Sequence, residues 1–331
     1  MMYGGLPWVL AASVALLPLP VIASDPGPAE WLERMSASVH SESYRGTFVL
    51  QRKDRLDTVR VIHAVEDGGY RERLHTLSGQ EREVVRSVDR LSAQSGTGAA
   101  SGGQAAEAGS TPRWPVSSPV HLLAEHDGYS LKDQGRSRVA GHACRMLLAR
   151  AGDLLRYSHR YCLHEDTGLP LLSELYSGSG QLLERLAFTD LELLDRVPDA
   201  ALEPVSEGAD RIEVRAERGH LRPDPDGRDW SFSELPSGFR LVVARERSSD
   251  DPEQPGRYFV VSDGLASVSV YVEPVEGERR FEGATRAGAT HAVARIEGDY
   301  QITAVGDVPR ETVERLAAAM HPPQPVGGRH E

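Results

Sequence analysis

Hydrophobic residues near the start of the chain recur at the spacing of a helix. Trp31, Leu32, Met35 and Val39 fall on one helical face, and Pro28 suits the first turn of a helix. The pattern therefore predicts an amphipathic helix over residues 28–39.

Beyond residue 43 the pattern changes to short runs of β-branched and aromatic residues, separated by charged or glycine-containing turns. Such runs predict strands, and their close spacing predicts an antiparallel meander, which a short helical stretch at residues 120–124 interrupts. One helix and many antiparallel strands predict an α+β fold, in which we expect the sheet to curl into a half-barrel around a cavity. The expected strands are residues 44–51, 58–63, 70–75, 83–86, 142–150, 155–163, 171–176 and 182–194.

A second strand-rich unit follows a polar, proline-containing stretch. Between residues 266 and 272, apolar residues alternate strictly with Ser267, Ser269 and Tyr271, which is typical of a strand with one buried face. We expect a closing helix over residues 307–320, capped by Asp307 and apolar on one face. The expected strands of this unit are residues 239–245, 257–262, 266–272, 290–296 and 300–305.

The first residues have the layout of a secretory signal. Residues 6–17 form an uncharged apolar run, and the small-residue site behind it predicts cleavage after Ala23. The run is too short to span a bilayer comfortably, so we expect the mature chain to be exported and soluble in the periplasm.

Shifts in composition and a polar, proline-containing stretch divide the rest of the chain into parts. Residues 92–111 contain no large apolar residue, so burial cannot offset the entropy of ordering them, and we expect a flexible insertion. The predicted parts are a signal peptide (1–23), an N-terminal domain (24–204) that holds this insertion, a linker (205–226), a smaller C-terminal domain (227–321), and a loose tail (322–331).

The overall charge narrows the class of partner. The 331 residues carry a formal net charge of −12, and phosphate binding needs an excess of Lys and Arg that this chain lacks, so no nucleic-acid partner is expected. The chain also lacks the glycine loop that binds phosphate, the nucleophile elbow and the zinc-protease motif. We therefore expect a protein that is not an enzyme and that binds no cofactor.

Two cysteines, Cys144 and Cys162, are the only ones in the chain. If residues 143–150 and 155–163 pair as a hairpin, one register places Cys144 opposite Cys162 and His142 opposite His164. In an oxidising compartment a disulfide is the leading interpretation. Two alternatives stay open, which are buried free thiols and a zinc site of two cysteines and two histidines.

Arginines concentrate between residues 45 and 90, interleaved with hydrophobic positions. One interpretation is a solvated strand face that pairs with nearby Glu and Asp. The other is a site for an anionic headgroup or an acidic peptide beside a lipid-sized cavity. The candidate residues of such a lipid cavity are Phe48, Leu50, Val59, Arg60, Val61 and Arg73.

Several short motifs occur in a fixed order along both halves of the chain. They are Trp31-Leu-Glu-Arg-Met35, Tyr44-Arg-Gly-Thr-Phe48, Arg60-Val-Ile-His63, Thr167-Gly-Leu-Pro-Leu171, Leu235-Pro-Ser-Gly-Phe239, Ser262-Asp-Gly-Leu-Ala-Ser-Val-Ser-Val270 and Val305-Gly-Asp-Val-Pro309. In order and spacing these motifs resemble the MucB/RseB family of periplasmic sigma-E regulators. The resemblance covers nearly the whole mature chain, and the run that begins at Ser262 is long enough to be specific.

The resemblance implies a lipoprotein-carrier-like half-barrel followed by a smaller α/β domain. It also implies that the protein binds the periplasmic segment of a membrane-spanning anti-sigma factor, shields it from proteolysis, and is released by lipid or lipopolysaccharide signals. Two features depart from the family pattern: the insertion at residues 92–111, and Cys144 and Cys162, which stand where ordinary strand residues are expected.

We place the partner-binding surface in the C-terminal domain. Trp230, Phe232 and Phe239 put three aromatic rings into a short segment beside the linker, and aromatic rings commonly anchor protein interfaces. The alternative is that Trp230 and Phe239 fill the core of their own domain. The full set of candidates is Trp230, Phe232, Leu235, Pro236, Phe239, Ser262, Asp263 and Tyr271.

Two classes of function therefore compete. The leading hypothesis is a negative regulator of the sigma-E envelope-stress response that binds an anti-sigma factor. The alternative is a periplasmic lipid or lipoprotein carrier, although a carrier has no need of the second domain. The sequence leaves the oligomeric state open, a homo-oligomer included.

Overall fold

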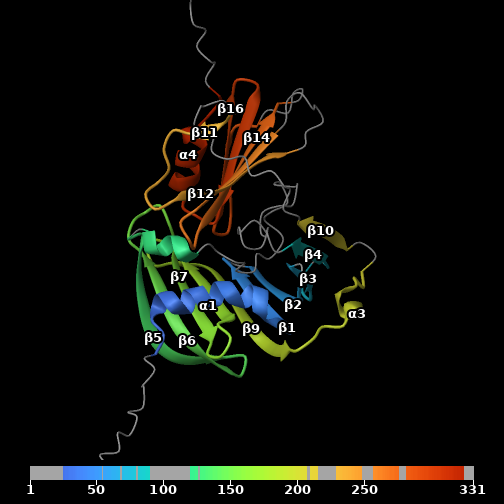
Figure 1. The fold of residues 1–331 in the computed structure, drawn as a ribbon. Helices are drawn as coiled ribbons and strands as arrows, with labels where there is room; N and C mark the ends of the chain where they lie inside the picture. The colour runs from blue at the N-terminus through green and yellow to red at the C-terminus, as the bar shows by residue number, and fades with distance from the viewer. Residues whose placement is uncertain are drawn as a thin grey trace, which may run out of the picture.

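Two mainly antiparallel sheets, one in each half of the chain, organise the structure, which is a computed structural model (Figure 1). It describes residues 25–53, 55–67, 69–79, 81–89, 120–125, 127–206, 209–214, 229–247, 256–275 and 281–323. The predicted signal peptide, the insertion at 92–111 and residues 324–331 of the predicted tail lie outside the described residues. Among the helices described, none is long and apolar enough to cross a bilayer.

The first helix forms where its periodicity predicts it. Helix α1 spans Pro28–Ser41 and lies across the strands of the first sheet, as Figure 1 shows. Its apolar face buries Trp31, Leu32 and Met35 in one cluster with Leu147 and Leu163 of the sheet. The helix is therefore held by its apolar face rather than by a side-chain cap, since its N-cap residue is a glycine.

The first sheet has ten strands in the order β10-β4-β3-β2-β1-β9-β8-β7-β6-β5. Every neighbouring pair is antiparallel except β10 and β4, which run parallel. Two short helices accompany the sheet, the 3-10 helix η2 (Val120–Glu125) and α3 (Asp199–Leu202). The strands are β1 (Ser43–Arg52), β2 (Arg55–Glu66), β3 (Gly69–Thr76), β4 (Glu83–Asp89), β5 (Tyr129–Val139), β6 (His142–Ala151), β7 (Ser158–His164), β8 (Pro170–Tyr176), β9 (Leu182–Leu194) and β10 (Asp210–Val214).

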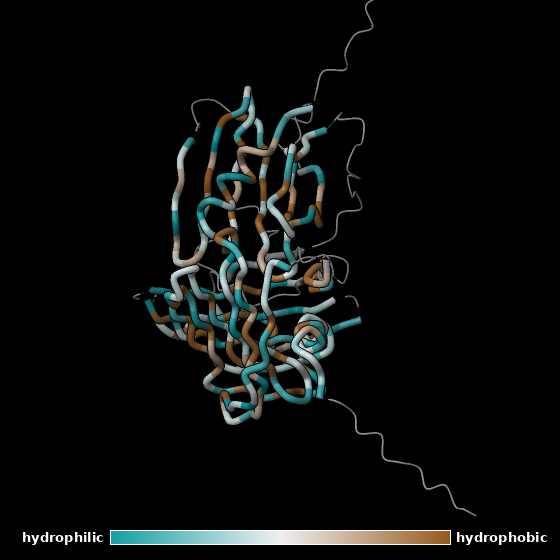
Figure 2. Tube along the Cα trace, turned by 90° about the vertical axis from the view of Figure 1, so that its left-hand side faces the viewer, coloured by the Kyte–Doolittle hydropathy of each residue, from teal (hydrophilic) through white to brown (hydrophobic). Residues whose placement is uncertain are grey.

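Two of these strands differ from the sequence-based expectation. Strand β5 was not predicted, because it is an edge strand whose residues are mostly exposed and so lack alternation of apolar and polar residues. Strand β10 lies within the predicted linker at 205–226, yet it extends the first sheet by pairing with β4. Figure 2 shows the alternation of hydrophobic and hydrophilic positions that made the other strands recognisable.

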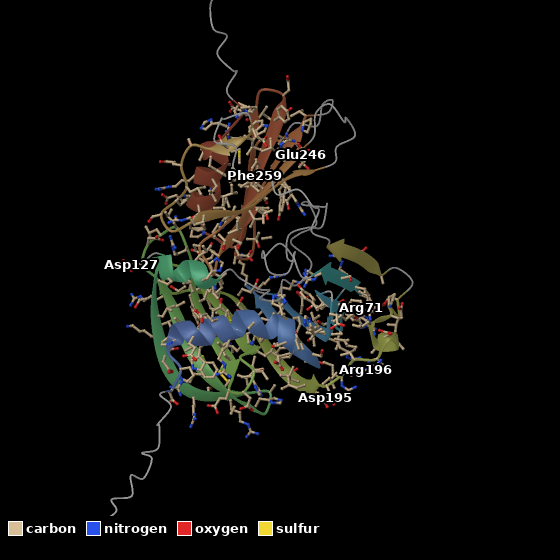
Figure 3. All side chains as sticks on the ribbon, viewed as in Figure 1. Arg71, Asp127, Asp195, Arg196, Glu246 and Phe259 are labelled. Carbon is tan, nitrogen blue, oxygen red and sulfur yellow. A yellow bond between two sulfur atoms is a disulfide. The ribbon has the colours of Figure 1, made fainter. Side chains whose placement is uncertain are left out.

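The second sheet is smaller and has the order β12-β13-β14-β17-β16-β15. Helix α4 (Arg310–Ala319) packs Val313 and Leu316 onto it, in a core that also contains Phe259, labelled in Figure 3. A pair of two-residue strands, β11 (Ser231–Phe232) and β18 (Met320–His321), closes one side. The six strands are β12 (Arg240–Arg247), β13 (Gly256–Ser262), β14 (Ser267–Pro274), β15 (Gly283–Ala287), β16 (Thr290–Glu297) and β17 (Tyr300–Gly306).

The predicted fold class is confirmed, because an open antiparallel sheet with few helices is followed by a smaller sheet covered by a helix. The predicted cap of the last helix is wrong. The N-cap residue of α4 is Pro309, whereas the carboxylate of Asp307 accepts a hydrogen bond from the Thr290 hydroxyl. Strand β15 was also missed, because its five residues are all exposed and carry no apolar alternation.

A disulfide joins Cys144 of β6 to Cys162 of β7, which confirms the leading interpretation of the two cysteines. The predicted register is wrong by two residues, since Cys144 lies opposite His164 and Met146 lies opposite Cys162. The cysteines are thus diagonal neighbours, with Cα atoms 5.4 Å apart. Because both sulfurs are bonded to each other, neither is available as a thiolate ligand for the zinc alternative.

We expect the exported protein to contain no titratable thiol until it is reduced, and two thiols afterwards. Reduction should lower the free energy of unfolding by about 3 kcal/mol, because it opens a loop of 18 residues in the unfolded chain. Urea unfolding with and without reductant measures the change, and the double variant C144A/C162A should be insensitive to reductant. Two reactive thiols in the native exported chain would contradict the disulfide.

Candidate functional site

The two domains meet where a loop of the second domain, residues 262–266, enters the first. Leu265 of this loop is 9% exposed and packs into the cluster of Trp31, Tyr161 and Leu163 beneath α1. Gly264 has φ +105, and a Cβ atom there would lie 3.0 Å from Cγ of Leu123 in η2. Only glycine adopts this conformation in so narrow a space without strain. The loop therefore fits closely between η2 and the sheet.

Asp263 makes the polar contact of this loop, and its side chain is fully buried. One carboxylate oxygen accepts hydrogen bonds from the backbone N–H groups of Leu265 and Ala266, at 3.0 and 2.8 Å. The other accepts from the Arg156 guanidinium at 2.9 Å and from the Tyr129 hydroxyl at 3.1 Å. Burial raises the pKa of Asp263, while these donors oppose the rise. All four donors point at one carboxylate, as a buried charge requires.

Arg156 supplies the opposite charge from the turn between β6 and β7, and its side chain is 1% exposed. Besides Asp263, its guanidinium donates to the backbone carbonyl of Ser237 in the second domain and to the carboxylate of Asp153 in its own turn. The guanidinium carbon lies 5.1 Å from the ring centre of Phe239 and 5.4 Å from that of Tyr129. A single side chain thus bonds to two segments of the second domain.

Further contacts extend the junction beyond this ion pair. The Thr312 hydroxyl at the start of α4 donates to the Leu155 carbonyl at 2.6 Å. Tyr157 packs with Leu183 and with Ala289 of the second domain in a buried apolar cluster. A hydrogen bond from Thr312 and an apolar contact at Ala289 flank the Arg156–Asp263 pair, so the two domains are joined along several elements.

A buried histidine lies beside the junction. His159 is 8% exposed, and its Nδ1 atom lies 3.0 Å from the Tyr161 hydroxyl. Its Nε2 atom has no hydrogen-bond partner among the described residues. Burial lowers the pKa of His159 to about 4, because the charged imidazolium would be desolvated there, while Asp307 opposes the shift. The imidazole is therefore neutral at pH 7.

The structure places the predicted partner-binding residues in or near this junction and the core of the second domain. Trp230 and Phe239 are buried in that core, which favours the alternative that the sequence left open, and Phe232 and Leu235 pack partly buried against it. The remaining candidates, Pro236, Ser262, Asp263 and Tyr271, are buried as well.

The predicted lipid-cavity residues do not form one surface. Phe48, Leu50, Val59 and Val61 pack together in a buried cluster of the first sheet. Arg60, next to Val59 and Val61 on β2, is exposed, because successive side chains of a strand point to opposite faces. Arg73 forms an ion pair with Glu83, whose carboxylate also accepts from the backbone of Val205 and Ser206.

The arginine-rich strands also hold a buried charged cluster. Glu72 is 1% exposed and pairs with Arg86, and Nδ1 of His63 lies 3.7 Å from the same carboxylate. Burial would raise the pKa of Glu72, but Arg86 and His63 outweigh it and lower that pKa to about 2. Arg86 and Arg73 therefore form ion pairs within the protein, as one of the two interpretations expected, but both pairs are largely buried and not solvated.

Sequence reasoning missed Arg156, Tyr129, Leu265 and His159 as residues of the junction. Arg156 carries no local signal, because its carboxylate partner lies 107 residues away in the chain. The only sequence signal for the contact between the domains was the Ser-Asp-Gly-Leu-Ala run at residues 262–266. In the structure this run forms the loop of the second domain that enters the first. These contacts fix the relative orientation of the two domains. The charged groups of Arg156 and Asp263 bond to each other and to neighbouring groups of the protein.

Comparisons with known proteins cover both halves of the chain. A family model described as the MucB/RseB N-terminal domain matches residues 27–206, and one described as the MucB/RseB C-terminal domain matches residues 224–321. Sigma factor AlgU regulatory protein MucB of Pseudomonas aeruginosa is 34% identical over 305 residues, which are 89% of this chain and 90% of the relative. Sigma-E factor regulatory protein RseB of Salmonella typhimurium is 27% identical over 304 residues, 89% of this chain and 91% of the relative.

Solved structures agree with these relatives. The complex of Pseudomonas aeruginosa MucA and MucB includes a chain that is 31% identical, with a TM-score of 0.64 over 90% of this chain and 99% of that one. A structure of MucB alone is 30% identical, with a TM-score of 0.65 over 89% of this chain and 98% of that one. The likeness therefore extends over both domains.

Removing the charge of Arg156 should destabilise the protein strongly. We expect R156M to lower the free energy of unfolding by about 3 kcal/mol, because the Asp263 carboxylate stays buried without its cation. Chemical denaturation measures the loss. In the matched control R45M, the pair with Glu192 is 60% and 53% exposed, and we expect a loss below about 1 kcal/mol. Equal losses in the two variants would show that the buried pair has no special role.

The pKa of His159 predicts how stability depends on pH. Below pH 6.5 the unfolded chain protonates this histidine, whereas the folded protein does so only near pH 4, so stability falls as the pH falls through this window. Between pH 7 and pH 5 we expect the loss from His159 to be roughly 2 kcal/mol. Urea unfolding of the wild type and of H159Q at both values measures it, since only the wild type should show this loss. The same pH dependence in both proteins would rule out His159 as its source.

Proposed function

Because the chain belongs to the MucB/RseB family, we propose that it is a periplasmic negative regulator of the sigma-E envelope-stress response. In this proposal the mature protein binds the periplasmic segment of a membrane-spanning anti-sigma factor. Binding shields that segment from proteolysis, so the sigma factor stays inactive until the complex dissociates. Release by a lipid or lipopolysaccharide signal is part of the proposal and rests on the family resemblance.

One observation supports this function most directly. The chain is similar over both of its domains to MucB as it occurs in a complex with MucA. The curated relatives are named as regulatory proteins of sigma factors, and they too are matched over about nine-tenths of their length. If the regulator needs both domains to bind its partner, the similarity to these relatives should extend over the second domain as well, as it does.

The junction supports a binding role for the second domain. The Arg156–Asp263 pair and the inserted Leu265 fix the two domains relative to each other, so a single extended partner segment can contact both without ordering them first. Phe232, which is only partly buried at the surface of the core, is our candidate contact among the predicted aromatic residues.

The carrier alternative receives less support from the packing. Four of its six predicted cavity residues pack against one another in a buried cluster, and one of the two arginines is engaged by a carboxylate. A carrier also leaves the second domain and its buried junction without a purpose.

Titration calorimetry tests the proposal. The purified mature chain is titrated with the purified periplasmic segment of the membrane-spanning anti-sigma factor from the same organism, and we expect saturable binding. The same segment should be cleaved more slowly by its periplasmic protease when the chain is present. If the segment does not bind, and the chain instead speeds the transfer of lipid between vesicles, the carrier alternative replaces this proposal.

A further inference from the structure

Strand β15 (Gly283–Ala287) is the edge of the second sheet, and its whole length is exposed. It pairs on one side with β16, through a hairpin whose closing pair is Ala287 and Thr290. A two-residue turn requires that closing pair to be hydrogen-bonded, and bonded pairs alternate along antiparallel strands. The backbone groups of Gly283, Thr285 and Ala287 therefore face β16, while those of Ala284 and Arg286 face outward.

This edge lacks the features that protect other edges of the two sheets. Strand β5 carries a bulge between Asp133 and Arg136, and β12 carries one between Leu241 and Val243. Bulges, prolines, charged side chains and short strands are common means by which proteins prevent a further strand from pairing. Strand β15 is short and carries one charged residue, Arg286, but it has no bulge, proline or lysine, and its register with β16 is continuous over five residues. Its outer side is therefore open to an added strand.

The residues at the two ends of β15 indicate which side chains an added strand would carry. Just before the strand, Phe281 is 56% exposed, the only aromatic residue among the large exposed hydrophobic side chains of the described chain. Its ring reaches Gly283, since a Cβ atom built there would lie 3.6 Å from Cζ of Phe281. An exposed aromatic ring beside an open edge is suited to anchor an apolar side chain of a partner.

The other end of β15 is basic and touches the first domain. A Cβ atom at Gly288 would lie 3.6 Å from Cδ of Arg52, so the β15–β16 turn lies against the end of β1. Arg52 pairs with Glu184, but neither Arg286 nor the exposed Lys53 forms an ion pair with any described residue. In a chain of net charge −12, two cations without counterions favour an acidic partner at this point.

We propose that the outer edge of β15 binds an extended, acidic segment of the anti-sigma factor, which adds to the second sheet as a seventh strand. The proposal rests on the proposed function and names its binding surface. The backbone of Ala284 and Arg286 pairs with the added strand, Phe281 contacts an apolar residue of it, and Arg286 and Lys53 contact its carboxylates. Because β15 ends against Arg52, the same segment continues onto the first domain.

A proline at position 284 provides the sharpest test. In A284P the outward N–H group is lost and the inward hydrogen bonds to β16 remain, so the fold should persist as proline is tolerated on such edges. We expect A284P to weaken binding of the periplasmic segment at least tenfold by titration calorimetry. The control A284V keeps the N–H group and should bind within twofold of the wild type. R286E should weaken binding more than R286K does, and high salt should reduce that difference.

Hydrogen exchange of the wild-type chain provides a measurement that does not depend on whether A284P folds. The amides of Ala284 and Arg286 should be unprotected in the free protein and protected in the complex, while those of Thr285 and Ala287 are protected in both. If the segment binds the wild type and leaves these two amides unprotected, or binds A284P equally well, the edge is not the site. If A284P instead converts a dimer to a monomer without changing binding, the edge pairs two copies of this chain. No binding by the wild type would overturn the proposed function and this proposal together.

Discussion

The buried ion pair between Arg156 and Asp263 is the central contact among those that set the relative position of the two domains. Removing two charges from water costs several kcal/mol for each ion, and their attraction repays this only when further hydrogen bonds complete both groups. Here the carboxylate has four donors, and the guanidinium binds a carbonyl and faces two aromatic rings. Such a pair defines one orientation, because any other would leave a buried charge unpaired. The inserted Leu265 adds the apolar contact, which contributes about 2 kcal/mol when a leucine is fully buried.

The first domain distributes its charges in a different way. Its exposed pairs, such as Arg45 with Glu192, lie in water and contribute little. Its buried pair of Glu72 and Arg86 lies within one sheet, so it constrains the strands of that sheet and not a neighbour. The disulfide between Cys144 and Cys162 likewise joins adjacent strands. The features that stiffen this domain are local, whereas the contacts that orient the second domain cross a long stretch of chain.

The aromatic residues show how burial separates structural from binding roles. Trp230 and Phe239 looked like interface anchors from their clustering in the chain, yet both complete the core of the second domain. Phe281 had no such cluster around it, but it is exposed beside an open sheet edge. Phe239 also forms one wall of the Arg156 site, so a core residue contributes to the junction. An aromatic residue near a linker is therefore weak evidence for an interface until its exposure is known.

The sequence by itself determined the two helices that frame the domains, most strands of both sheets, the family and the identity of the disulfide partners. The helices, strands and family follow from periodicities and motifs within a few residues of one another. The disulfide partners follow because the chain contains only two cysteines. It did not reveal β5 or β15, because edge strands are exposed and carry no alternation. It gave the cysteines the wrong register, since the turn after β6 is longer than the sequence indicated: β7 begins at Ser158, whereas the expected strand began at residue 155. Only the tertiary structure decided that Arg156 meets Asp263 and that β15 is left with an open edge, because both result from where distant segments are packed.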